Sequence, residues 1–75
     1  MNEMRNLKLK TSDFNRFEIT RKIGIIYRKA DGMSLDFRYD RNINEKEGYI
    51  NVSVTGNEKD VSEFIDYVRK YFVIL

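Results

Sequence analysis

The sequence predicts an α+β fold in which an antiparallel sheet carries two helices on one face. Three observations predict it. Apolar and polar residues alternate over short runs near residues 5–10, 33–39 and 48–54, as they do in half-buried strands. An apolar stripe with helical spacing follows the last run, and a second helical pattern separates the first two runs. With 75 residues, the chain is expected to form one domain, 1–75.

The first strand is expected at about residues 5–10, where Leu7 and Leu9 point to one side of the sheet. The polar residues between and beside them point to the other side. The side-chain oxygens of residues 11–13 then suit a turn or the N-cap of a helix, because they can accept hydrogen bonds from the free N–H groups of its first turn.

Residues 14–30 fit two different structures. As a helix, they carry an apolar stripe at Ile19, Ile23, Ile26, Tyr27 and Ala30. Gly32 would then be the C′ residue, where glycine adopts a left-handed backbone at little cost. As strands, residues 17–55 would form a three-stranded meander that turns at Asp31-Gly32. Periodicity alone leaves both structures open.

The next two strands are expected to pair as an antiparallel hairpin. Apolar residues at 33, 35, 37 and 39 predict the second strand, and the polar segment 42–47 predicts a loop after it. Gly48 opens the third strand, which Gly56 is expected to break. In this strand, the inward residues are Ile50, Val52 and Val54, and the outward residues are Tyr49, Asn51 and Ser53.

The second helix has the clearest local signals. Asn57 is its expected N-cap, and Glu58 and Asp60 lie at the positive end of the helix dipole. Its apolar stripe consists of Val61, Phe64, Ile65, Val68 and Phe72. Asp66 is expected to pair with Lys70, four residues later. The apolar residues 73–75 complete a short terminal strand, and the order β-α-β-β-α-(β) is that of the ferredoxin-like class.

The composition argues against catalysis and against bound metals. The chain contains no cysteine and no histidine, so we expect no disulfide, no conventional zinc site and no base-activated nucleophile. The carboxylate pairs Glu45 with Glu47 and Glu58 with Asp60 are expected to be solvated. The four glycines form no phosphate-binding loop. We therefore expect a protein that is not an enzyme and that holds no cofactor.

Size and charge bear on its partners. One core supplies little stability in so short a chain, so homodimerisation is expected as a source of further burial. No signal peptide or membrane segment is visible, and a cytoplasmic location is the default. Residues 1–30 hold eight Lys/Arg against three Asp/Glu, whereas residues 31–75 hold six against nine. This bias indicates either an ordinary solvated surface or a face for an acidic or nucleic-acid partner.

The stretch from Gly48 to the end of the chain resembles the NIL domain, the ACT-like ferredoxin-fold module attached to the ATPase of bacterial methionine importers. The resemblance rests on the strand opened by Gly48, the second glycine eight residues later, the apolar helix face that follows and the β-branched terminal residues. It can be laid over nearly the whole chain, and it implies a helix at about residues 17–27. A proline that starts the first helix of that family is replaced here by Ile19.

The resemblance implies a non-enzymatic regulatory module that forms a homodimer and binds a small amino-acid-like ligand. Its first expected site is the outward side of the third strand, Tyr49, Asn51 and Ser53, together with the loop 42–47. The alternative is an interaction module for a protein or nucleic-acid partner. It would use the basic face of the first helix, formed by Arg21, Lys22, Arg28 and Lys29.

Overall fold

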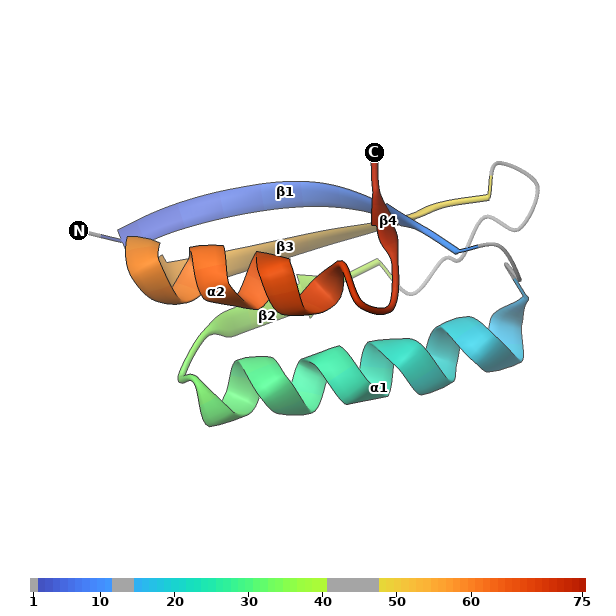
Figure 1. Cartoon of the computed structure of the whole chain (residues 1–75), viewed down its shortest axis with the longest axis horizontal. Helices are drawn as coiled ribbons and strands as arrows, with labels where there is room; N and C mark the ends of the chain where they lie inside the picture. The colour runs from blue at the N-terminus through green and yellow to red at the C-terminus, as the bar shows by residue number, and fades with distance from the viewer. Residues whose placement is uncertain (1, 12–14, 41–47) are drawn as a thin grey trace.

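The computed structural model describes residues 2–11, 15–40 and 48–75. In chain order, its elements are β1 (Asn2–Lys10), α1 (Arg16–Gly32), β2 (Asp36–Tyr39), β3 (Ile50–Asn57), α2 (Glu58–Val68) and β4 (Val73–Ile74). The strands form one sheet in the order β2-β3-β1-β4, and every pair is antiparallel (Figure 1). Each β-α-β unit is therefore split by a strand of the other unit, as in ferredoxin-like folds. The predicted α+β class is confirmed.

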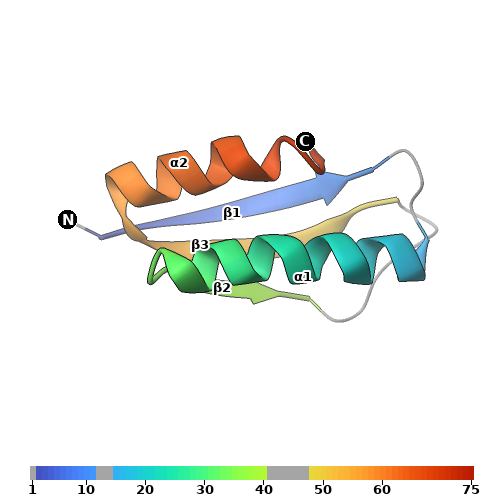
Figure 2. The ribbon, with the colours of Figure 1, turned by 60° about the horizontal axis from the view of Figure 1, so that its bottom comes forward.

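Both helices lie on the same face of the sheet (Figure 1, Figure 2). Apolar side chains from the inner face of the sheet and from the two helices form one buried cluster. Phe64 of α2 lies near its centre and packs edge-on against Phe37 of β2, with the ring centroids 5.5 Å apart. The outer face of the sheet is polar, so the sheet has the one-sided burial that alternating strands predict.

The long pairing of β1 with β3 forms the middle of the sheet. It runs in register from Asn2 opposite Asn57 to Leu9 opposite Ile50. β1 thus begins three residues before the predicted range of 5–10. Residues 2–4 carry no apolar alternation, and they are extended because β3 provides a partner strand along their whole length.

Residues 16–32 form a helix, so the alternative three-stranded meander is wrong. Its N-cap is Asn15 rather than one of residues 11–13: the Asn15 side chain accepts a hydrogen bond of 2.9 Å from the Glu18 N–H. Four of the five residues of the predicted stripe are buried, while Tyr27 is exposed and forms a T-shaped ring contact with Phe37, with the centroids 6.1 Å apart.

The end of α1 also differs from the prediction. Gly32 belongs to the helix, and Met33 follows as its C-cap. The left-handed backbone that was expected at Gly32 is instead at Ser34, whose φ is 58°. Leu35 then donates its backbone N–H to the Ala30 carbonyl at 2.9 Å, which satisfies one of the last carbonyls of the helix.

Gly56 does not break β3, because the strand continues to Asn57. A side chain is excluded at this position for a different reason: a Cβ there would lie 2.3 Å from Cδ2 of Leu35. The glycine thus lets the β2 side of the core pack closely against β3. Gly56 is therefore needed to avoid a clash with Leu35, and it does not end the strand.

α2 agrees with its prediction in its extent, its cap and its buried face. The Asn57 side chain accepts a hydrogen bond of 2.9 Å from the Lys59 N–H. All five predicted core residues, Val61 to Phe72, are buried. The expected ion pair is wrong in its partner, because Asp66 pairs with Arg69 at 2.9 Å and not with Lys70. Lys70 lies instead above the ring of Tyr67.

Candidate functional site

The outward residues of β3 line a shallow hollow on the outer face of the sheet. Asn51 and Ser53 lie directly opposite Lys8 and Asn6 of β1 in the strand register. These four side chains, with the strand segments between them, surround a volume of about 410 Å³. Asn6 and Lys8 therefore join the predicted site, although the sequence prediction did not include them. Their signal was present, since both alternate with Leu7 and Leu9 and had to point outward.

Tyr49 lies beside this hollow and contributes through Lys8. The Lys8 ammonium is 5.0 Å from the centroid of the Tyr49 ring, in the geometry of a cation–π contact. Such a contact holds the lysine at the sheet surface instead of leaving it extended into water. The loop 42–47, the other half of the predicted site, lies outside the described residues.

The polar groups of this outer-face hollow suit the binding of a small polar ligand. It offers one ammonium group, two carboxamides and one hydroxyl, which together provide a positive charge, hydrogen-bond donors and hydrogen-bond acceptors. A small zwitterionic or anionic molecule is the ligand class that the set complements, because a carboxylate pairs well with an ammonium.

The edge of the sheet next to the hollow is largely uncovered. Within the described residues, β4 pairs with β1 only at Leu9 and Lys10, and the Leu75 N–H adds one hydrogen bond of 2.9 Å to the Lys8 carbonyl. That bond shows that the Lys8 carbonyl points to this edge. Backbone groups alternate along a strand, so those of Met4 and Asn6 point the same way. Met4 is 62% exposed there.

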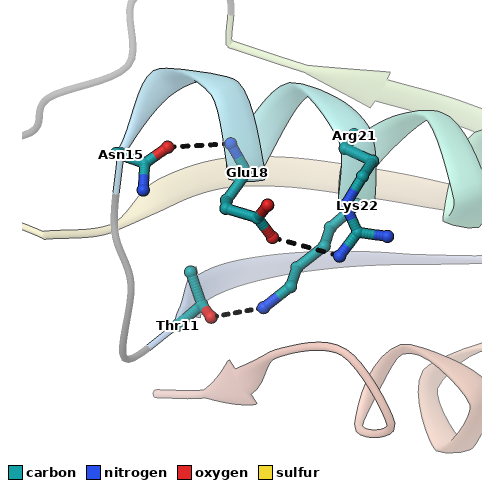
Figure 3. A network of polar contacts seen from close by, with 5 residues as sticks. All are labelled: Thr11, Asn15, Glu18, Arg21 and Lys22. Carbon is teal, nitrogen blue, oxygen red and sulfur yellow. Dashed lines mark hydrogen bonds and ion pairs between the residues drawn. The ribbon is translucent and has the colours of Figure 1, made fainter.

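The four basic residues predicted as one face of α1 do not behave alike. Arg21 pairs with Glu18 at 3.0 Å, and Glu18 is itself in the turn capped by Asn15 (Figure 3). Lys22 is half-buried, which corrects its expected place on a solvated face. It donates a hydrogen bond of 2.7 Å to Oγ1 of Thr11 (Figure 3), and its ammonium lies 6.0 Å from the ring centroid of Phe72. Arg28 and Lys29 are exposed, as expected.

Two tyrosines meet the basic side of α1. Tyr67 of α2 and Tyr71 just after it have ring centroids 5.5 Å apart and hydroxyl oxygens 3.5 Å apart. The ammonium groups of Lys29 and Lys70 lie 5.3 and 5.5 Å from the centroid of the Tyr67 ring. The hydrogen bond with Tyr67 raises the pKa of Tyr71, and partial burial raises it further, while Lys70 and Arg21 act in the opposite direction. Because its pKa is raised, the Tyr71 hydroxyl is favoured as a hydrogen-bond donor.

A second hollow, of about 380 Å³, lies between α1 and the ends of β2 and β3. Ile19, Ile23 and Ile50 provide apolar lining, and Tyr39 flanks it. Gly24 also lines it, and a Cβ added at Gly24 would meet no atom within 4 Å. Part of the volume of this hollow is thus space that a side chain at position 24 would occupy.

Metal binding has no support among the residues that the structure describes, because they include no group of three carboxylates that could hold an ion. Of the carboxylate pairs considered, Glu58 and Asp60 lie in the first turn of α2, and Glu45 and Glu47 lie outside the described part of the chain. No helix in that part is long and apolar enough to cross a membrane.

Comparison of the chain with protein-family models, with curated proteins and with solved structures finds no match in any of the three. The function must therefore be argued from the outer-face hollow, the uncovered edge of β1 and the tyrosine pair.

Proposed function

We propose that this protein is a non-enzymatic regulatory module that binds a small amino-acid-type ligand on the outer face of its sheet and works as a homodimer. The observation that carries the proposal is the outer-face hollow, in which Asn51 and Ser53 face Lys8 and Asn6 across the strand register. The resemblance to NIL and ACT-like domains points to the same face and the same class of ligand.

The roles of the side chains follow from their chemistry. The Lys8 ammonium, held near the Tyr49 ring, would bind the ligand carboxylate by a charge-assisted hydrogen bond. The carboxamide oxygens of Asn6 and Asn51 would accept from its amino group, and the Ser53 hydroxyl can serve either group. A cytoplasmic setting suits such a sensor of small metabolites.

The uncovered edge of β1 supports the dimer. If two copies pair antiparallel about Met4, then Asn2 lies opposite Asn6 of the second copy, and Glu3 lies opposite Arg5. Glu3 and Arg5 already pair within one chain at 3.3 Å, so the same two charges could pair across the edge. This register buries Met4 against its own copy. It also brings Asn2 of the second copy to the rim of the hollow, which places the ligand beside the seam.

Ligand binding is tested by thermal denaturation against a panel of free amino acids at millimolar concentration. A ligand at about 100 times its Kd stabilises the folded state by about 2.7 kcal/mol, which corresponds to about 10–20 °C in Tm for a chain of this size. Lys8→Gln should weaken the effect about tenfold in Kd, whereas Lys10→Gln, on the same side of the same strand, should leave it unchanged. A panel without any shift would refute the ligand half of the proposal.

The dimer is tested separately, by sedimentation of the free protein. Met4→Lys puts two like charges at the two-fold axis and should give a monomer. Val73→Lys is the matched control, because Val73 is 61% exposed and Met4 is 62% exposed. A wild-type protein that sediments as a monomer with and without ligand would remove the dimer from the proposal.

A further inference from the structure

The helical side of the molecule carries a second surface, which the ligand proposal does not use. It consists of Arg21, Lys22 and Lys29 of α1, with Tyr67, Lys70 and Tyr71 of α2 and the turn after it; we call it the tyrosine seam. Lys29 and Lys70 lie above the Tyr67 ring, and the positive charges of Lys70 and Arg21 act to lower the pKa of the Tyr71 hydroxyl. Both helices cover the same face of the sheet (Figure 2), whereas the outer-face hollow is on the other face of the sheet.

The positive charge of the tyrosine seam is left largely uncompensated. Arg21 has a carboxylate partner, Glu18. In the described part of the chain, Lys22, Lys29 and Lys70 are in contact with a hydroxyl or an aromatic ring and with no carboxylate. A hydroxyl and a π face hold an ammonium in position, but they are neutral and cancel none of its charge. The nearby acid Asp66 is paired with Arg69.

We propose that the tyrosine seam docks an acidic segment of a protein partner. Charge complementarity selects an anionic partner, since three positioned ammonium groups would each gain a carboxylate without breaking an ion pair. Tyrosine and arginine are also the residues that contribute most often to the centres of protein interfaces. Phe17, one helical turn before Arg21, is 77% exposed and offers an apolar anchor next to the charges.

The same contacts disfavour single-stranded nucleic acid as the partner. Nucleic-acid grooves of this kind combine basic residues with aromatic faces on which bases stack. Here the Tyr67 ring is already in contact with two ammonium groups, at 5.3 and 5.5 Å, so stacking a base would displace them. A tyrosine hydroxyl can instead donate a hydrogen bond to a carboxylate at the edge of the ring.

The test is a titration of the full chain, labelled with ¹⁵N, with a synthetic 16-residue peptide rich in Glu and Asp that carries a leucine stripe at helical spacing. Amide shifts are expected along α1 and at the end of α2, around Arg21, Lys29 and Tyr67, and not at Asn6 or Asn51 of the hollow. A single-stranded oligonucleotide of similar charge is titrated in parallel, and affinity should fall with salt for both.

Matched variants decide the outcome. Lys29→Gln with Lys70→Gln should weaken peptide binding about tenfold, and Tyr71→Phe about threefold, as expected for the loss of two ionic contacts and one hydrogen bond. Lys59→Gln, which removes an exposed charge at the other end of α2, should change it less than twofold. Each variant is checked for an unchanged Tm.

Three results would overturn the inference: tighter binding of the oligonucleotide than of the peptide, amide shifts centred on the outer face of the sheet, or equal losses in Lys59→Gln and the double variant. Amino-acid binding at the hollow is measured without the peptide, so the failure of either proposal leaves the other intact.

Discussion

The two helices cover the same face of the sheet, but they differ in how much of their sequence serves packing. α2 is capped by Asn57 and buries all of its aliphatic residues together with Phe64. α1 buries four residues, yet it also exposes Phe17 and keeps Gly24 in its middle, where a side chain would meet no neighbour. Four of the 11 residues of α2 are buried, against four of the 17 residues of α1, so α1 leaves the larger share of its positions outside the core. Those positions are where we look for a partner.

The largest expected effect is the contrast between two phenylalanines. Phe64→Ala should lower the free energy of unfolding by about 3–5 kcal/mol, because it opens a cavity at the centre of the core. Phe17→Ala should change it by less than about 0.5 kcal/mol, because the ring is mostly in water. Urea denaturation measures both. Similar losses for the two variants would mean that α1 anchors the fold as strongly as α2.

The next largest effect is expected just before α2. Gly56→Ala should cost about 1–3 kcal/mol, because the new Cβ would lie 2.3 Å from Cδ2 of Leu35 and would force that side chain to move. In a double-mutant cycle with Leu35→Ala, the combined loss should be smaller than the sum of the two single losses. Simple additivity would show that the clash is relieved elsewhere.

Smaller effects are expected at the two N-caps. Asn15→Ala and Asn57→Ala each remove a side-chain acceptor 2.9 Å from a backbone N–H, and each should cost about 1 kcal/mol. Asn→Asp at either site should retain most of the stability, since aspartate caps equally well. If Asn57→Ala destabilised the protein and Asn15→Ala did not, the first turn of α1 would contribute nothing to stability. The two helices would then differ even more in their importance for the fold.

The smallest effect is expected at Gly24, and it has the opposite sign. Gly24→Ala should stabilise the protein by about 0.5–1 kcal/mol, because alanine is the better helix former and the site has room for its methyl group. Gly48→Ala is the contrasting control and should destabilise, since Gly48 has a φ of 77°. Thermal denaturation compares the two. A destabilised Gly24→Ala variant would contradict the open space seen beside α1.

Most of the fold could be predicted because its signals are local. The cap at Asn57 and the apolar stripe from Val61 to Val68 both indicate a helix over the same residues. A prediction is reliable when capping and hydrophobic pattern agree in this way. α1 was ambiguous because its isoleucines satisfy both a helical and an alternating pattern over part of their length. The choice between them came from the spacing of the resembled family, and the structure confirms the helix.

The surfaces were harder to predict than the core. Tyr49, Asn51 and Ser53 were found because an outward strand position follows from alternation. Their neighbours Asn6 and Lys8 were missed because they are over 40 residues away in the chain. Neither strand sequence alone specifies the register that pairs β1 with β3. The tyrosine seam was only partly predicted: the basic residues of α1 were noted, but Tyr67 belongs to α2 and Tyr71 to the turn after it.

By itself, the sequence determined the class of the fold, the second helix and its cap, and the division of each strand into an apolar and a polar side. These features depend on hydrophobic periodicity and on contacts between residues close in sequence. Both are present within a single segment of the chain. Only the tertiary structure decided that Gly56 makes room for Leu35, that Lys22 turns to Thr11, and that β4 leaves most of the β1 edge uncovered. Each of these depends on close packing between segments distant in sequence, and no local sequence pattern predicts such packing.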